Sequence, residues 1–138
     1  MENSYIIKVP SKVEIRPSKR HGMGVFATEK ILEGEVIEEC HIIPVQRVSD
    51  PNKYFMADYK FDNPVKGTTK EYVLPLGYGA VYNHDDNNNA GWRNHLDSSR
   101  NTFEFFAIRD IEPGEEICTK YGTNHYWETV NKAKNKLI

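Results

Sequence analysis

Two similar segments near the two ends of the chain constrain the fold more than any other feature. Ala27–Ile37 has the sequence ATEKILEGEVI and Ala107–Ile117 has AIRDIEPGEEI, so alanine, isoleucine, glycine, glutamate and isoleucine recur at the same offsets. Each copy predicts a strand end, a turn closed by Gly-Glu and a new strand, with Ile31 or Ile111 tucked beneath the turn. Because a solenoid needs at least three repeats, two copies predict a mainly β fold of short, folded-over sheets.

The rest of the chain alternates between short strands and turns. Pro51–Gly67 is polar and aromatic and predicts an irregular insertion, while the Lys-rich tail Asn124–Ile138 predicts a short C-terminal helix. With 138 residues, we expect one domain, residues 1–138, with its core at about 13–127. Segments rich in Val, Ile and Phe predict strands at Val13–Arg16, Gly24–Ala27, Glu35–Cys40, Ile42–Val48, Glu71–Pro75 and Thr102–Arg109.

Composition argues against several classes of function. The net charge of −2 gives no reason to expect direct binding to nucleic acid. Apolar stretches are too short for a membrane span, and Met1–Pro10 lacks the apolar core of a signal peptide, so we expect a cytoplasmic protein. Cys40 and Cys118 lie outside any CxxC spacing, which predicts two buried thiols and no metal site.

Two short motifs indicate a ligand site through glycine and aromatic residues. The segment HGMGVFA, His21–Ala27, contains a Gly-x-Gly turn whose backbone can approach a ligand closely. It lacks GK[ST] and a following helix, so it is no phosphate loop, and a tight β turn is the simpler interpretation. Tyr and Trp in Ile117–Trp127 could form a flat wall for a heterocycle, although ordinary aromatic core is the alternative.

A third motif, Tyr82–Ala90, is a run of Asn and Asp that follows Tyr-Asn-His. From Asp85 onward its first, third and fifth positions match a calcium loop, but the sixth is Ala90 instead of Gly and the twelfth is Leu96 instead of Glu. The calcium interpretation therefore fails. A polar turn capped by its own side chains and a binding segment remain as alternatives.

Taken in order, the three motifs resemble the SET-domain protein-lysine methyltransferases, most closely small stand-alone viral and bacterial members. That family has Gly-x-Gly near the N-terminus, then Asn-His, then Gly-Glu-Glu followed by Tyr; here these are HGMGVFA, GYGAVYNHDDNNNA and PGEEICTKYG. The resemblance extends from about Val13 to Trp127. It implies a SET-type β-clip fold with a knot-like C-terminal crossing, and methyl transfer from S-adenosyl-L-methionine to lysine in a basic protein such as a histone.

The resemblance also implies which residues bind the donor. The backbone of Gly22, Met23 and Gly24 would wrap it, and Asn83 and His84 would hold it further along the cleft. Tyr121 would contact it as well, and Trp127 or Tyr126 would pack on the adenine. The family pattern has Ser or Cys after Asn-His and Pro before a closing Asn, whereas this chain has Asp85 and Asn88 before Asn89.

For the lysine substrate, the resemblance points to tyrosines. Tyr121 matches the active-site tyrosine of the family. Tyr59 is expected to line the lysine channel and to share in catalysis, with Tyr126 as a second channel residue. Small members of the family can dimerise, so a homodimer is expected, and a viral or secreted member would act in a host nucleus.

Other interpretations remain open at this point. The doubled corner also resembles β-clip modules that only bind ligands or partners, and a SET relative that has lost its substrate would act as a regulator. Four glutamates, Glu33, Glu35, Glu38 and Glu39, predict either a solvated charged face or a groove for a Lys-rich tail.

Overall fold

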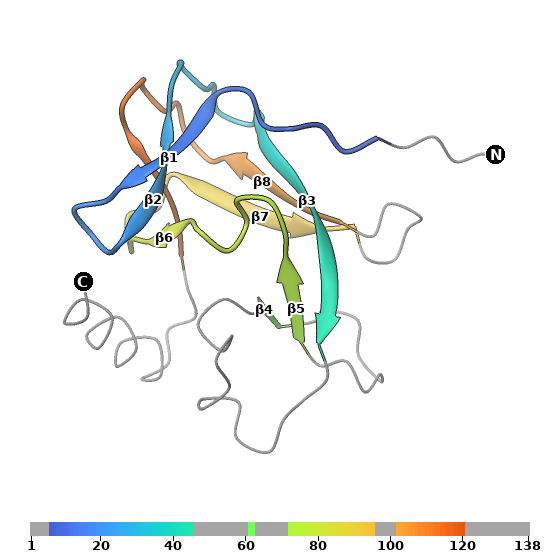
Figure 1. Ribbon diagram of the computed structural model, residues 1–138. Coiled ribbons are helices and arrows are strands. Elements are labelled where there is room, and N and C mark those ends of the chain that lie inside the picture. The colour runs from blue at the N-terminus through green and yellow to red at the C-terminus, as the bar shows by residue number, and fades with distance from the viewer. Residues whose placement is uncertain (1–5, 46–60, 63–71, 96–101, 121–138) are drawn as a thin grey trace.

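The computed structural model describes residues 6–45, 61–62, 72–95 and 102–120, and these ranges contain strands and turns arranged in two sheets (Figure 1). The predicted insertion at Pro51–Gly67, apart from Phe61–Asp62, and the predicted C-terminal helix lie outside the described residues. The mainly β class is confirmed. The strands are β1 Val13–Pro17, β2 Met23–Ala27, β3 Val36–Val45, β4 Phe61–Asp62, β5 Tyr72–Pro75, β6 Asn83–His84, β7 Ala90–Asn94, β8 Thr102–Ala107 and β9 Glu116–Thr119.

The two sheets are discontinuous in sequence. One has the strand order β1-β2-β9-β6 and the other β4-β5-β3-β8-β7, so each combines strands from both halves of the chain. β6 pairs with β9 in parallel, whereas the other strand pairs are antiparallel. This parallel pair joins the segment Asn83-His84 to the segment that leads toward Tyr121, as the family resemblance implies. Any knot-like crossing would continue beyond Lys120, outside the described residues.

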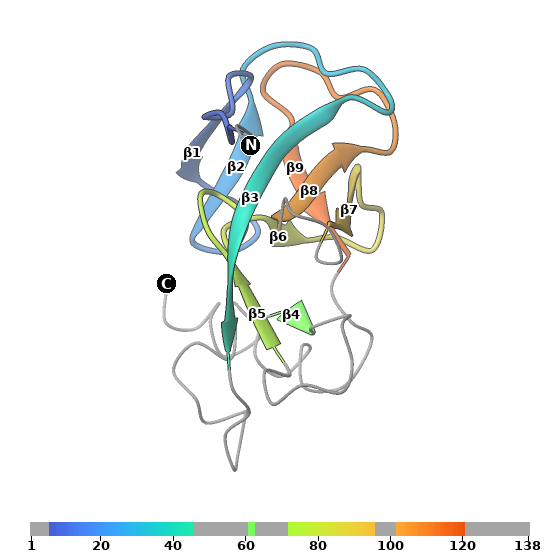
Figure 2. The same cartoon turned by 90° about the vertical axis from the view of Figure 1, so that its right-hand side faces the viewer.

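The two repeated segments form corners that lie side by side, between β2 and β3 and between β8 and β9 (Figures 1 and 2). Ile31 and Ile111 form a β-bridge with N–H···O distances of 2.9 and 2.8 Å. The amide of Gly34 donates to Ala107 O at 2.8 Å, and Gly114 donates to the alanine carbonyl of the first copy at 2.7 Å. Both glycines have φ near +85°, a region that side chains disfavour. The predicted doubled corner is confirmed.

β3 is the strand that links the two halves of the larger sheet. Its first part, from Val36 to His41, pairs with β8, and its second part pairs with β5. The strands expected separately at Glu35–Cys40 and Ile42–Val48 are therefore one strand, bent by a bulge between Val36 and Glu38. β4, β6 and β7 were not predicted as strands. β4, inside the predicted irregular insertion, and β6 have only two residues each, and β7 depends on pairing with β8 along its whole length.

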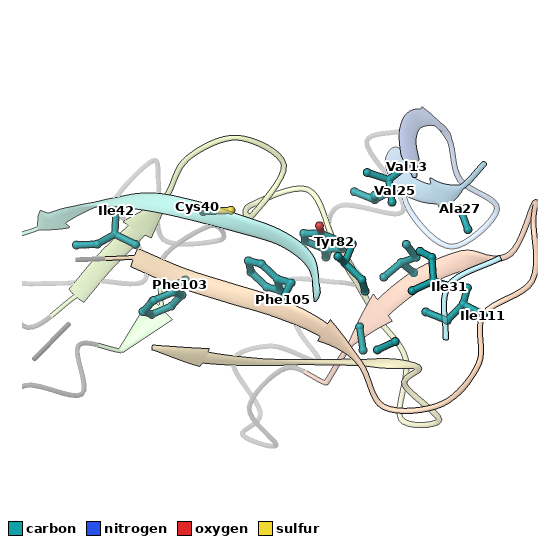
Figure 3. Packing of buried hydrophobic residues seen from close by; sticks show 14 of the residues in the cluster. Val13, Val25, Ala27, Ile31, Cys40, Ile42, Tyr82, Phe103, Phe105 and Ile111 are labelled. Atoms are coloured by element: carbon teal, nitrogen blue, oxygen red, sulfur yellow. The ribbon is translucent and has the colours of Figure 1, made fainter. Parts of the chain in front are cut away.

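Aromatic and branched side chains fill the core between the sheets (Figure 3). Phe103 and Phe105 of β8 are fully buried, and the ring of Phe105 stacks on Tyr82 at a centroid distance of 4.5 Å. Full burial of such a side chain stabilises the fold by about 1.5–3 kcal/mol. Cys40 and Cys118 are buried free thiols, as predicted.

The four glutamates around the first corner do not share one solvated face. Glu38 is only 3% exposed, accepts a hydrogen bond from Tyr82 Oη at 2.6 Å and accepts another from Tyr78 N at 2.8 Å. Burial raises the pKa of the Glu38 carboxyl. Glu35 is partly exposed and pairs with Lys12 Nζ at 2.7 Å. The expectation of a common solvated face or groove is therefore wrong for Glu38.

Candidate functional site

Asn83 joins the Gly-x-Gly turn to strand β9. Its Nδ2 donates to His21 O at 3.0 Å, to Met23 O at 3.1 Å and to Glu116 Oε2 at 2.8 Å. His21 and Met23 lie 62 and 60 residues before Asn83 in the sequence. The Gly-x-Gly turn and the Asn83-His84 segment therefore meet at one place, and Glu116 of the segment PGEEICTKYG bonds to Asn83 there.

Gly24 has no room for a side chain. A Cβ at this position would lie 2.3 Å from Glu116 Oε2 and 3.1 Å from Asn83 Nδ2. Gly22 has φ +49°, which also favours glycine. Met23, between them, is 49% exposed, and its carbonyl accepts a hydrogen bond from Asn83.

Glu116 is a buried carboxylate that the sequence did not single out. Besides Asn83, it accepts hydrogen bonds from Ser18 Oγ at 2.8 Å and from Arg20 Nη1 at 2.9 Å. The repeat held a signal for it, because Val36 stands at the equivalent position of the first copy. A carboxylate where the repeat partner is apolar indicates a local polar network, and the structure has one.

His84 lies at the parallel pairing of β6 with β9, opposite Thr119. Its Nε2 is 3.0 Å from Asp86 Oδ1, and the ring is partly exposed. Lys120 follows β9 and ends the described range. The predicted site residues Tyr59, Tyr121, Tyr126 and Trp127 lie outside the described residues.

Asn89 fastens the polar turn to β9. Its Oδ1 accepts from Cys118 N at 2.9 Å, and its Nδ2 donates to Glu116 O at 2.8 Å. Earlier in the same turn, Asp85 Oδ1 accepts from Asn87 N at 2.9 Å, a turn closed by its own side chain. The segment forms a polar turn, one of the two alternatives that the sequence left open, and the side-chain atoms of Asn89 bind the protein itself.

Residues 6–45, 61–62, 72–95 and 102–120 carry neither a metal cluster nor a membrane-spanning helix. Within these ranges, no three His, Cys, Asp or Glu side chains cluster in a way that could hold a metal ion. None of their segments forms a helix with the length and apolar character needed to cross a membrane.

Comparison with known proteins identifies the family. Residues 22–122 match the model of the SET domain. The chain belongs to the SET-domain family. The histone-lysine N-methyltransferase of Schizosaccharomyces pombe specific for H3 lysine-37 is 34% identical over 121 residues, covering 86% of this chain and 78% of that protein. The crystal structure of a candidate histone methyltransferase from Plasmodium falciparum superposes with a TM-score of 0.62 at 30% identity, covering 86% of this chain and 99% of that one.

Membership settles the class of enzyme. This SET-domain chain is a protein-lysine N-methyltransferase, and the methyl donor of the family is S-adenosyl-L-methionine. The comparisons do not favour the alternative of a non-enzymatic β-clip module. Both relatives come from eukaryotes, so the expected closeness to viral and bacterial members stays a prediction.

Proposed function

We propose that this enzyme methylates lysine in a histone tail or another Lys-rich protein, and that its donor site lies where the Gly-x-Gly turn meets Asn83-His84. The observation that supports this placement is the triple contact of Asn83 Nδ2 with His21 O, Met23 O and Glu116 Oε2. It brings together two motifs that lie 62 and 60 residues apart in the sequence.

The residues at this place fit the donor. Gly22 and Gly24 leave the turn without side chains, so backbone N–H and C=O groups around Met23 can approach a polar ligand. His84 directly follows Asn83 in β6 and is partly exposed. When bound, S-adenosyl-L-methionine supplies a methyl group on a positively charged sulfur. We assign donor binding to these residues and Asn83, together with Tyr121 and Trp127.

The lysine must reach the methyl group as a neutral amine. Free lysine has a pKa of about 10.4, so most of it is protonated at neutral pH. An aromatic channel disfavours the ammonium because it removes water from the charge. We assign this channel to Tyr59 and Tyr126, and orientation of the amine to the hydroxyl of Tyr121. Alignment of this kind can contribute several kcal/mol, up to about 7–11 in favourable cases.

Methyl transfer from labelled donor to purified histones tests this proposal. Tyr121→Phe keeps the ring that would contact the donor and removes the hydroxyl that would orient the amine. It is therefore expected to reduce turnover strongly while circular dichroism and binding of S-adenosylhomocysteine stay close to wild type. Tyr78→Phe is the matched control, since it removes the hydroxyl of a tyrosine packed at the edge of the core and is expected to keep activity. Full activity in Tyr121→Phe would show that its role is assigned wrongly.

Substrate and oligomeric state need separate measurements. Mass spectrometry of histones and other basic proteins after the reaction identifies the modified lysine; labelling of no basic protein would contradict the proposed substrate class. A homodimer is part of the proposal, because small members of the family can dimerise. Analytical ultracentrifugation tests it, and a monomer at working concentration would exclude it.

A further inference from the structure

Arg20 joins three separate segments around the proposed donor site. It lies in the turn between β1 and β2, and its Nη2 is 2.7 Å and its Nε 3.2 Å from Asp85 Oδ2. On the other side, its Nη1 is 2.9 Å from Glu116 Oε1. Asp85 directly follows His84, and Glu116 is the first residue of β9. One guanidinium therefore connects the turn before Gly22, the end of β6 and the start of β9.

The turn that carries Arg20 is organised by short-range bonds as well. Ser18 N donates to Gly22 O at 2.7 Å, and Ser18 Oγ accepts from Arg20 N at 2.9 Å. The same hydroxyl donates to Glu116 at 2.8 Å. Gly22 closes this turn and begins the Gly-x-Gly motif. Disorder in residues 18–22 would therefore displace the backbone proposed to bind the donor.

Charge explains why an arginine is needed at this place. The Glu116 side chain is only 4% exposed, and its partners Ser18 and Asn83 are neutral, so Arg20 compensates its charge. Asp85 supplies the second carboxylate that holds the guanidinium. The hydrogen bond from Arg20, and next the amide of Asn87, lower the pKa of Asp85. Arg20 and Asp85 are therefore both charged at neutral pH.

We propose that Arg20 is a positioning residue of the donor site, which holds the 18–22 turn against the Asn83-His84 segment through Asp85 and Glu116 and thereby increases donor affinity. This inference rests on the proposed donor site. The family pattern has Ser or Cys at the position of Asp85, and a carboxylate there forms an ion pair with Arg20 that Ser or Cys would not form. If the turn is already ordered, donor binding does not have to overcome the entropy cost of ordering it. The apparent affinity then rises with the fraction of molecules whose turn is in the binding conformation.

Calorimetric titration of the full chain with S-adenosylhomocysteine tests the inference. Asp85→Asn removes the charge and keeps an oxygen for Asn87 N, so it should fold and raise the Kd about two- to fivefold, the range for one exposed ion pair. Arg20→Gln loses both carboxylates and should raise the Kd about tenfold. The double variant should bind no worse than Arg20→Gln, because the two residues act as one unit.

Steady-state kinetics separates positioning from general damage. The KM for the donor should rise in step with the Kd, while kcat at saturating donor stays within about twofold of wild type. Lys30→Gln is the control: Lys30 pairs with Glu112 at 3.5 Å at the corner, at the other end of β2, and its loss should leave donor affinity unchanged. In wild type, high salt should weaken donor binding more than it does in Asp85→Asn.

Three outcomes would overturn the inference, and the third differs from the first two. If wild type binds S-adenosylhomocysteine and both variants bind it equally well, Arg20 has no positioning role although the donor site stands. A fall in kcat with unchanged Kd has the same meaning. If wild type binds no S-adenosylhomocysteine at all, the proposed donor site itself fails and the inference fails with it.

Discussion

Ile31 and Ile111 lie opposite each other and exchange backbone hydrogen bonds of 2.9 and 2.8 Å, with both side chains fully buried. They occupy equivalent positions in the two repeated segments. The chain therefore uses one corner twice and closes each copy with the other. Since β3 leaves one corner and β9 leaves the other, this contact fixes the relation between the two sheets.

Ile31→Ala and Ile111→Ala are expected to destabilise the protein to a similar extent, by about 2–5 kcal/mol each. Each change leaves a cavity in the buried core at the place where the two isoleucines face each other. Urea unfolding followed by circular dichroism measures the free energy of unfolding. Leu32→Ala is the control, because Leu32 is exposed and its loss should cost about 0.5 kcal/mol or less. An Ile111→Ala variant as stable as Leu32→Ala would show that burial of Ile111 at this corner does not stabilise the fold.

The corners were predictable because their chemistry is local. In each copy the glutamate after the glycine accepts a hydrogen bond from the amide three residues earlier: Leu32 N to Glu35 Oε1 at 3.0 Å and Glu112 N to Glu115 Oε1 at 3.1 Å. A short sequence holds all the information for such a turn.

The polar network of the site was predictable only in part. Family resemblance singled out Asn83, but the contacts of Glu116 with Ser18 and Arg20 span 98 and 96 residues. Contacts that distant leave no pattern in a local window. β7 was not predicted for the same reason, because it becomes a strand by pairing with β8. It also contains Gly91, and glycine is depleted in strands.

Gly24→Ala is expected to abolish measurable donor binding, or to weaken it at least tenfold. The new Cβ would lie 2.3 Å from Glu116 Oε2, so the carboxylate and Asn83 must move, and overpacking of this kind costs about 1–3 kcal/mol. Calorimetry with S-adenosylhomocysteine measures the effect.

Gly34→Ala is the matched control for that substitution. Gly34 has φ +85° and nothing within 4 Å of an added Cβ, so alanine there adds backbone strain of about 1–3 kcal/mol and no clash. The variant should lose stability and keep donor affinity. Equal affinity in Gly24→Ala and wild type would show that the packing of Gly24 against Glu116 does not govern the site.

Glu38 should make stability depend on pH in a direction opposite to that of a surface carboxylate in an ion pair. Burial raises its pKa, partly offset by hydrogen bonds from Tyr82, Tyr78 and Cys40. The folded state therefore keeps a proton that the unfolded chain, with an ordinary pKa of about 4.3, has lost. The contribution of Glu38 to stability is fully present below about pH 4.3 and is lost as pH rises through the raised pKa.

Glu38→Gln removes this titration and keeps an oxygen that can accept from Tyr82. Unfolding free energies of wild type and variant, measured in urea from pH 4 to 8, should diverge as pH rises, with wild type losing stability relative to the variant. Glu33→Gln, at an exposed position, is the control and should run parallel to wild type. Parallel curves for Glu38→Gln and wild type would contradict the prediction.

Cys118 should resist thiol reagents in the folded protein. Burial, followed by the negative charge of Glu116, raises its pKa to about 12, so the thiol stays protonated at pH 8 and the reactive thiolate is scarce. Burial likewise raises the pKa of Cys40. Ellman's reagent is expected to label neither thiol in the native state, and both after unfolding in guanidinium chloride. Thr28→Cys, at an exposed corner position, is the positive control and should react at once.

The same shift affects stability at alkaline pH. The folded pKa of Cys118 lies above the ordinary value of about 8.5, so its contribution is fully present below pH 8.5 and is lost as pH rises toward 12. Cys118→Ala should therefore lose stability less steeply than wild type between pH 8.5 and 10.5 in urea unfolding. Native labelling of Cys118 at pH 8 at a rate close to that of Thr28→Cys would contradict the prediction. It would mean that β9 opens readily and that Glu116, on the same strand, is not held in the contacts described above.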